Sequence, residues 1–194
     1  MNNKMFWYDV LRAGAIVGIV MALSRIFERY QLVFRDADMG SIAVVYLLEW
    51  FVAAGLFIAM LYFFARRRAK AADAEVGFSY GQALSYILLV SMLAGVIVGV
   101  ADTIYINAMG YDVYVDGLIG RLGELRNMYI GVGYNGADIK MFDDVAHSIR
   151  TSEQPSMLSN VFAGFNNYIL FGGLPGLIIA SLVRRDPEHR AFNE

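Results

Sequence analysis

The stretch Ile42–Ala65, IAVVYLLEWFVAAGLFIAMLYFFA, decides the fold class of this chain, because Glu49 is its one charged residue. About 20 apolar residues are needed to cross the hydrocarbon layer of a bilayer, and helices of soluble proteins rarely stay apolar on every face for that length. The stretch ends directly before Arg66, Arg67 and Arg68. It therefore predicts a membrane-spanning helix.

The composition agrees with a chain that lies mostly in lipid. Hydrophobic residues make up 58% of the sequence and the mean hydropathy is +0.48, whereas soluble domains are about 45–50% apolar. The net charge of −2 argues against a nucleic-acid partner, which would favour a basic surface. Cysteine is absent, which excludes disulfides, thiolate catalysis and cysteine-based metal sites.

Three further apolar segments have helical length, so we predict an all-α membrane protein in which residues 1–194 form a single membrane domain. The four transmembrane helices are expected at about 13–34, 42–65, 79–106 and 158–183.

The connection between the third and fourth spans, residues 107–157, predicts an amphipathic helical hairpin. Two stretches in it carry apolar residues at helical spacing; these residues are Val115, Leu118, Ile119, Leu122 and Leu125, then Ile139, Phe142, Val145, Ala146 and Ile149. The two apolar faces could meet each other, lie on the membrane surface or receive a partner.

Two basic clusters set the predicted orientation. Arg66, Arg67, Arg68 and Lys70 follow the second span, and Arg184 with Arg185 follows the fourth. Because basic residues collect on the cytoplasmic side of membrane proteins, we expect both termini in the cytoplasm and the hairpin outside. The clusters either serve only as this orientation signal or also bind anionic lipid headgroups.

Polar residues gather near the external ends of the four spans. The residues that we expect to form a buried polar cluster are Arg25, Glu28, Glu49, Asp102 and Asn167. Glu49 lies about 10 Å inside its span at 1.5 Å per residue, and a lone charge in mid-bilayer costs roughly 3 kcal/mol on insertion scales. We expect Arg25 to lie between Glu49 and Asp102, with Asn167 filling a hydrogen-bonding position. The cluster could be an ion-paired staple, a cavity for a headgroup, ion or proton, or a contact with a partner.

Small residues recur at four-residue spacing in three of the spans. They are Gly14 and Gly18, Gly95 and Gly99, and Gly172 and Gly176. Glycines at this spacing allow helix backbones to approach closely in lipid, so we expect them at helix contacts.

Motifs with catalytic or cofactor chemistry are weak. Residues 131–136 match G-x-G-x-x-G, but a dinucleotide site needs a preceding strand and a following helix, and here the glycines more simply turn the chain. Asp144 and His147 supply too few ligands for a metal. The sequence therefore predicts no cofactor, no metal site and no enzymatic activity.

Several short motifs carry a family resemblance. They are Gly77–Ala83 (GFSYGQA) before the third span, Ile104–Asn107 (IYIN) at its end, the hairpin, and a glycine-rich last span that ends in Arg184-Arg185. With these motifs the chain resembles the bacterial membrane proteins grouped as domain of unknown function 4199. The resemblance implies a bacterial inner-membrane protein without an assigned activity, and makes an accessory role in envelope assembly conceivable.

Two functions remain open from the sequence. The first is a non-enzymatic accessory or scaffold protein that uses its glycine stripes and hairpin to form a homo-oligomer or to bind a membrane partner. The second is a small lipid- or ion-binding membrane protein that uses the buried polar cluster.

Overall fold

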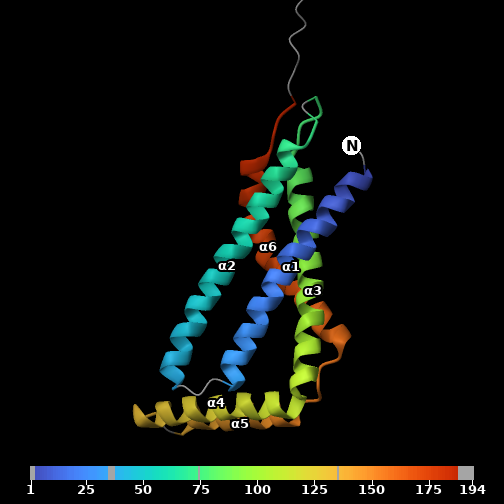
Figure 1. Cartoon of the computed structure of the whole chain (residues 1–194). Helices are drawn as coiled ribbons and strands as arrows, with labels where there is room; N and C mark the ends of the chain where they lie inside the picture. Colours follow the sequence, from blue (N-terminus) through green and yellow to red (C-terminus); the bar gives the residue numbers. More distant parts are fainter. Residues whose placement is uncertain (1–2, 35–37, 74, 135, 188–194) are drawn as a thin grey trace, which may run out of the picture.

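The computed structural model describes residues 3–34, 38–73, 75–134 and 136–187, which fold into helices (Figure 1). The helices are α1 (Asn3–Phe34), α2 (Met39–Lys70), α3 (Tyr80–Met109), α4 (Tyr111–Gly131), α5 (Ala137–Thr151) and α6 (Met157–Val183). In these ranges four helices, α1, α2, α3 and α6, are long and apolar enough to cross a membrane. The predicted all-α class is confirmed, and each predicted span falls on one of these helices.

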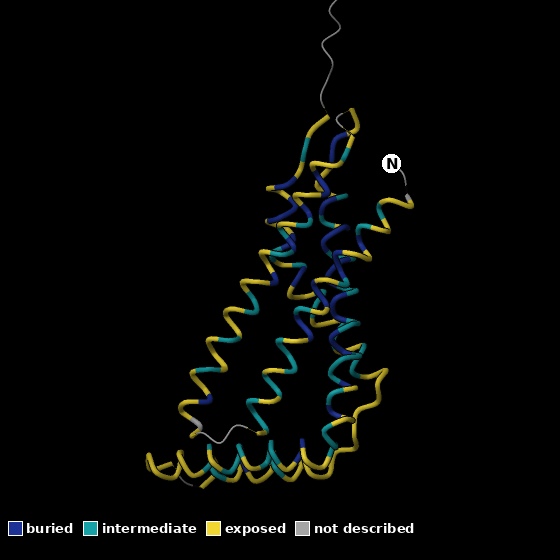
Figure 2. The backbone as a smooth tube through the Cα atoms, viewed as in Figure 1, coloured by how far each residue is buried: buried dark blue, intermediate teal, exposed yellow. Residues whose placement is uncertain are grey.

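The core lies where α3 packs between α1 and α6. Buried side chains on α3 recur at helical spacing on two faces, and among them Ile87, Val90 and Ala94 are fully enclosed. One face of α3 meets α1 at Gly14 and Gly18, and the other meets α6. Figure 2 shows this enclosed centre, whereas much of α2 is exposed along its length. The large apolar side chains on the outer faces suit contact with lipid rather than with water.

Glycines allow these helices to approach closely. A β-carbon on Gly18 of α1 would lie 2.9 Å from Ile97 and 3.1 Å from the backbone of Ala94 on α3. A β-carbon on Gly95 of α3 would collide with the carbonyl oxygen of Gly164 on α6, and the reverse also holds. The other four predicted packing glycines also have a side chain or backbone of a neighbouring helix within 3.1 Å of such a β-carbon; they are Gly14, Gly99, Gly172 and Gly176. These glycines are occupied by contacts within the chain, so they offer no free surface for a second copy.

Helix α2 packs against the core of the four long helices through its second half. Phe57, Leu61 and Ala65 follow one another at four-residue spacing and are buried in the core. The same face continues toward the start of α2 through Trp50 and Tyr46, which are 49% and 41% exposed. Figure 1 shows α2 diverging from α3 and α6 toward the end that holds α4 and α5. The first half of α2 therefore leaves space beside α1, α3 and α6.

Helices α4 and α5 lie side by side across one end of the four long helices (Figure 1). Arg121 of α4 donates a hydrogen bond of 2.9 Å to the carbonyl oxygen of Leu32, near the end of α1. Gly117 of α4 lies against Val33, since a β-carbon there would be 2.8 Å from that side chain. Helix α5 packs on α4, where Phe142 is buried. The two predicted hairpin helices are present. Phe142 of α5 contacts Tyr129 of α4, with ring centroids 5.1 Å apart, and α4 also contacts α1.

The turn between α4 and α5 contains the G-x-G-x-x-G segment. Gly133 and Gly136 have φ angles of 93° and 63°, which favour glycine because it lacks a β-carbon. The segment joins two helices rather than a strand and a helix, as expected from the sequence.

The position of Arg68 differs from the prediction that its side chain is available to lipid headgroups. Its side chain is 6% exposed and forms a 2.9 Å ion pair with Asp9 of α1. Its guanidinium carbon also lies 5.8 Å from the ring centroid of Phe6. Arg68 therefore joins the end of α2 to the start of α1. The remaining predicted headgroup residues are not buried; they are Arg66, Arg67, Lys70, Arg184 and Arg185.

The motif that opens the third span has a structural role. Ser79 and Gln82 form a capping box at the start of α3, which satisfies two free backbone donors of its first turn. Phe78 and Arg185 exchange two backbone hydrogen bonds of 2.7 and 2.9 Å. Gly77 has a φ angle of 71°, and a β-carbon on it would lie 2.5 Å from the Arg185 carbonyl oxygen. This motif fastens the segment after α6 to the start of α3.

Candidate functional site

A cavity of about 370 Å³ lies between α1, α2, α3 and α6, on the side where α2 diverges. All five residues of the predicted polar cluster line it, namely Arg25, Glu28, Glu49, Asp102 and Asn167. The volume falls within the range of about 300–1,000 Å³ that is usual for small-molecule sites. The cavity is therefore large enough for a lipid headgroup or a similarly small molecule.

One ion pair in the cavity lies within α1. Arg25 Nη1 donates to both carboxylate oxygens of Glu28 at 2.6 and 2.5 Å. The Tyr46 hydroxyl of α2 donates a further hydrogen bond of 2.7 Å to Glu28. Glu28 therefore has three donors, and it links α1 to the first half of α2.

The second ion pair joins α1 to α3, and its basic partner differs from the one that the sequence predicted. Arg29, rather than Arg25, forms a two-point contact with Asp102, with Nε to Oδ1 at 3.0 Å and Nη2 to Oδ2 at 2.9 Å. The two side chains are 14% and 13% exposed. Tyr114 of α4 covers this pair, because the Arg29 guanidinium carbon lies 4.8 Å from its ring centroid. Arg25 and Arg29 are four residues apart on one face of α1, so both reach the cavity and the helix offset decides which one meets Asp102.

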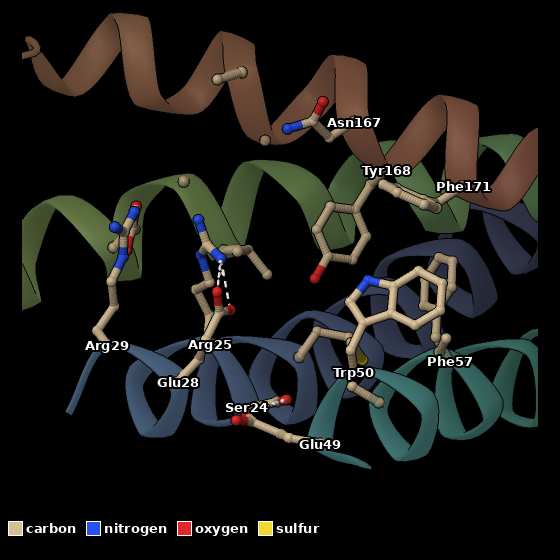
Figure 3. A pocket seen from close by; sticks show the side chains of 18 of the residues that line it. Ser24, Arg25, Glu28, Arg29, Glu49, Trp50, Phe57, Asn167, Tyr168 and Phe171 are labelled. Atoms are coloured by element: carbon tan, nitrogen blue, oxygen red, sulfur yellow. Dashed lines mark hydrogen bonds and ion pairs between the residues drawn. The ribbon is translucent and has the colours of Figure 1, made fainter. Parts of the chain in front are cut away.

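Glu49 is placed on the cavity lining but not in the predicted pair with Arg25. Its Oε1 accepts a hydrogen bond of 3.3 Å from Ser24. Its Oε2 is buried and, among the residues that the structure describes, has no hydrogen-bond partner. A buried polar atom without a partner is costly, so it usually marks a water, an ion or a ligand. Figure 3 shows Ser24 and Glu49 facing each other between α1 and α2.

Aromatic side chains form the other part of the lining. Trp50 and Phe57 come from α2, and Tyr168 and Phe171 come from α6. Phe57 and Tyr168 pack edge to face with ring centroids 5.3 Å apart, which closes the cavity toward the core. Figure 3 shows Trp50 and Tyr168 projecting into the space between α2 and α6. The cavity thus combines a charged region with an aromatic region.

The amide that fills a hydrogen-bonding position is Asn160 rather than the predicted Asn167. Asn160 of α6 donates a 3.0 Å hydrogen bond to Thr103 of α3, whose hydroxyl donates to the Gly99 carbonyl oxygen at 2.9 Å. Asn167 lines the cavity but is exposed. It stands beside the opening between α2 and α6, where an occupant could meet it.

Sequence reasoning missed Arg29, Tyr46 and Trp50 as lining residues. Arg29 follows Arg25 by four residues. On the inward face of α2, Tyr46 precedes Trp50 by four residues and Trp50 precedes Phe57 by seven. Helical periodicity read outward from Glu49 and Arg25 is the signal that could have found them.

Within the described ranges, no group of three or more His, Cys, Asp or Glu side chains is arranged to hold a metal ion. The lining instead offers two ion pairs, one further carboxylate, hydroxyl groups and aromatic rings.

Together these features define a class of helical protein with four helices that are able to cross a membrane and with a polar cavity between them. The profile of one family, described as "Protein of unknown function (DUF4199)", matches residues 12–185. The chain belongs to this family, and the match confirms the resemblance seen in the sequence. Comparison with curated proteins and with solved structures gives no match.

Proposed function

We propose that this protein is a non-enzymatic membrane protein that binds a membrane lipid in the cavity between α2 and α6. The observation that carries the proposal is the buried Glu49 oxygen, which has no hydrogen-bond partner among the described residues and which lies in a cavity lined by aromatic rings and two ion pairs. Lipid ligands have a polar headgroup and apolar chains, and the lining has matching regions.

The opening of the cavity supports entry from the side. Trp50 on α2 and Phe171 on α6 line the cavity, yet they are 49% and 56% exposed on the outside of the molecule. On the α1 side, α2 is held by the Ser24–Glu49 and Tyr46–Glu28 contacts. The gap therefore faces α6, where a lipid that lies in the bilayer could insert its headgroup while its chains stay on the apolar exterior.

A pair of tryptophan substitutions on α2 tests lipid binding. Ala54 lines the cavity, so Ala54→Trp should fill it and reduce the lipid that remains bound after purification in mild detergent. Ala59 is exposed on the same helix, so Ala59→Trp is the matched control and should retain wild-type lipid. Mass spectrometry of the extracted lipid gives the number of lipids per chain. Equal retention in both variants would refute the proposal.

We propose further that the protein lies in the bacterial inner membrane with both termini in the cytoplasm and α4–α5 outside. Support comes from the basic clusters after α2 and α6, which lie at the end of the molecule opposite to α4 and α5 (Figure 1). Because the chain has no cysteine, single cysteines can report the orientation. Ser152→Cys should react with an impermeant maleimide in intact spheroplasts, and Asp73→Cys only after lysis; the opposite pattern would reverse the orientation.

A scaffold function in envelope assembly is the second candidate, and the position of α5 favours it. Helix α5 packs on α4 and leaves its opposite face exposed, including Asp144. Asp144→Cys should form a disulfide-linked homodimer in membranes if this face binds a second copy. Phe142→Cys, which is buried against α4, is the control. Only monomer from Asp144→Cys under oxidising conditions would count against self-association through α5.

A further inference from the structure

We infer that the lipid bound in the cavity carries a protonated amine in its headgroup and that Glu49 is the residue that receives it. The inference rests on the proposed lipid binding and adds the chemical class of the headgroup. It follows from the charges that remain after the pairs within the cavity are formed.

The first step concerns the balance of charges. Two guanidinium groups line the cavity, and each is already paired: Arg25 with Glu28, and Arg29 with Asp102. Glu49 is the third carboxylate of the lining, and within the described part of the chain it forms no ion pair. An anionic headgroup would have to share an arginine with the carboxylate that already pairs with it, whereas a cation meets a carboxylate that has no arginine partner.

The second step concerns the surroundings of Glu49. Trp50 follows Glu49 on α2, and Tyr168 projects from α6 into the space beside Trp50 (Figure 3). Tyr46 of α2 also lines the cavity. An ammonium group is attracted to the faces of such rings. A carboxylate together with aromatic faces therefore suits an amine, whereas a sugar or glycerol headgroup would gain hydrogen bonds but no charge pairing.

The third step concerns access to the carboxylate. Glu49 is held by a single hydrogen bond of 3.3 Å from Ser24, which is long for a bond to an ionised acceptor. Its second oxygen has no hydrogen-bond partner in the described part of the chain. The side chain can therefore turn toward an occupant at little cost, and the occupant would supply the missing donor.

The test uses the full chain in mild detergent, with three lipids that share the same acyl chains. Phosphatidylethanolamine carries the amine, N-acetyl phosphatidylethanolamine has lost its positive charge, and phosphatidylglycerol has a hydroxyl headgroup. Native mass spectrometry measures the dissociation constant of each lipid. The variant is Glu49→Gln, which keeps the shape and the acceptor for Ser24. Its control is Glu153→Gln, an exposed carboxylate in the connection between α5 and α6.

We expect wild-type protein to bind phosphatidylethanolamine about tenfold or more tightly than either other lipid, because a hydrogen bond between charged groups is roughly that strong. Glu49→Gln should remove this preference, and Glu153→Gln should keep it. If all three lipids bind equally to wild type, lipid binding stands and the amine inference is refuted. If Glu49→Gln retains the preference, the amine is held elsewhere and the inference is again refuted. If no lipid binds, both the inference and the proposed function are refuted.

Discussion

Replacement of Arg29 by glutamine should be among the most destabilising single changes near the cavity. Arg29 makes two contacts of 3.0 and 2.9 Å with Asp102, and both side chains are largely buried. Loss of one partner leaves a buried carboxylate without a countercharge, which costs about 3–5 kcal/mol. For a chain of this length, that loss lowers the melting temperature by about 6–20 °C. The contact of Arg29 with the Tyr114 ring is lost as well.

A double-mutant cycle separates this pair from the one that the sequence predicted. Reversible unfolding in mixed micelles gives the free energy of unfolding for Arg29→Gln, Asp102→Asn and the double variant. We expect a coupling energy of about 1–3 kcal/mol, which is usual for residues in direct contact. The matched cycle of Arg25→Gln with Asp102→Asn should give less than about 0.5 kcal/mol. A strong coupling for Arg25 and a weak one for Arg29 would show that the arrangement of α1 against α3 is wrong.

Three further changes test other parts of the molecule. Gly95→Ala should destabilise the protein by about 2 kcal/mol or more, because its β-carbon would collide with the α6 backbone and small residues govern such helix contacts; Gly81→Ala, in open space, should leave the melting temperature unchanged or raise it. Arg68→Gln should lower the melting temperature and Arg66→Gln should not, because only the first is buried against α1; equal effects would contradict the packing of α2. Hydrogen bonds from Ser41 in the first turn of α2 lower the pKa of Asp38 below its ordinary value of 3.8. The ionised Asp38 cap therefore stabilises the first turn fully above pH 3.8. This stabilisation is lost as the pH falls through the lowered pKa of Asp38. Hydrogen exchange in the first turn should therefore accelerate only in acid, and Asp38→Asn, which also caps helices, should remove this dependence.

The helices could be predicted because lipid imposes a simple rule on the sequence. A segment that crosses a bilayer must be apolar over its length, so the runs of apolar residues locate α1, α2, α3 and α6 directly. The helices extend beyond the predicted spans, as at Asn3–Phe34 and Met39–Lys70. Hydropathy marks only the apolar segment, whereas a helix continues through polar residues outside the lipid.

The polar cavity could be predicted in part. Charged residues within apolar helices turn toward one another because lipid does not solvate them, and this rule identified Arg25, Glu49 and Asp102. It could not decide the pairing, because Arg25 and Arg29 lie one turn apart on the same face. Which of them meets Asp102 depends on the axial offset between α1 and α3, two helices that approach closely at Gly14 and Gly18.

The divergence of α2 could not be predicted from its hydropathy. Both halves of this helix are equally apolar in the sequence, yet Phe57 and Leu61 are buried whereas Trp50 is half exposed. The first half of α2 diverges from α3 and α6, and those two helices contact each other directly through Gly95 and Gly164 (Figure 1). The same packing explains why the glycine stripes serve contacts within the chain.

Electron cryo-microscopy of the protein in nanodiscs formed directly from its native membrane would test the lipid site most directly. We expect density for a lipid between α2 and α6, with its headgroup in contact with the Glu49 carboxylate and its chains along the exterior of α6. A map in which α2 closes against α6 along its whole length, so that no cavity remains and Glu49 faces another helix, would contradict the proposal.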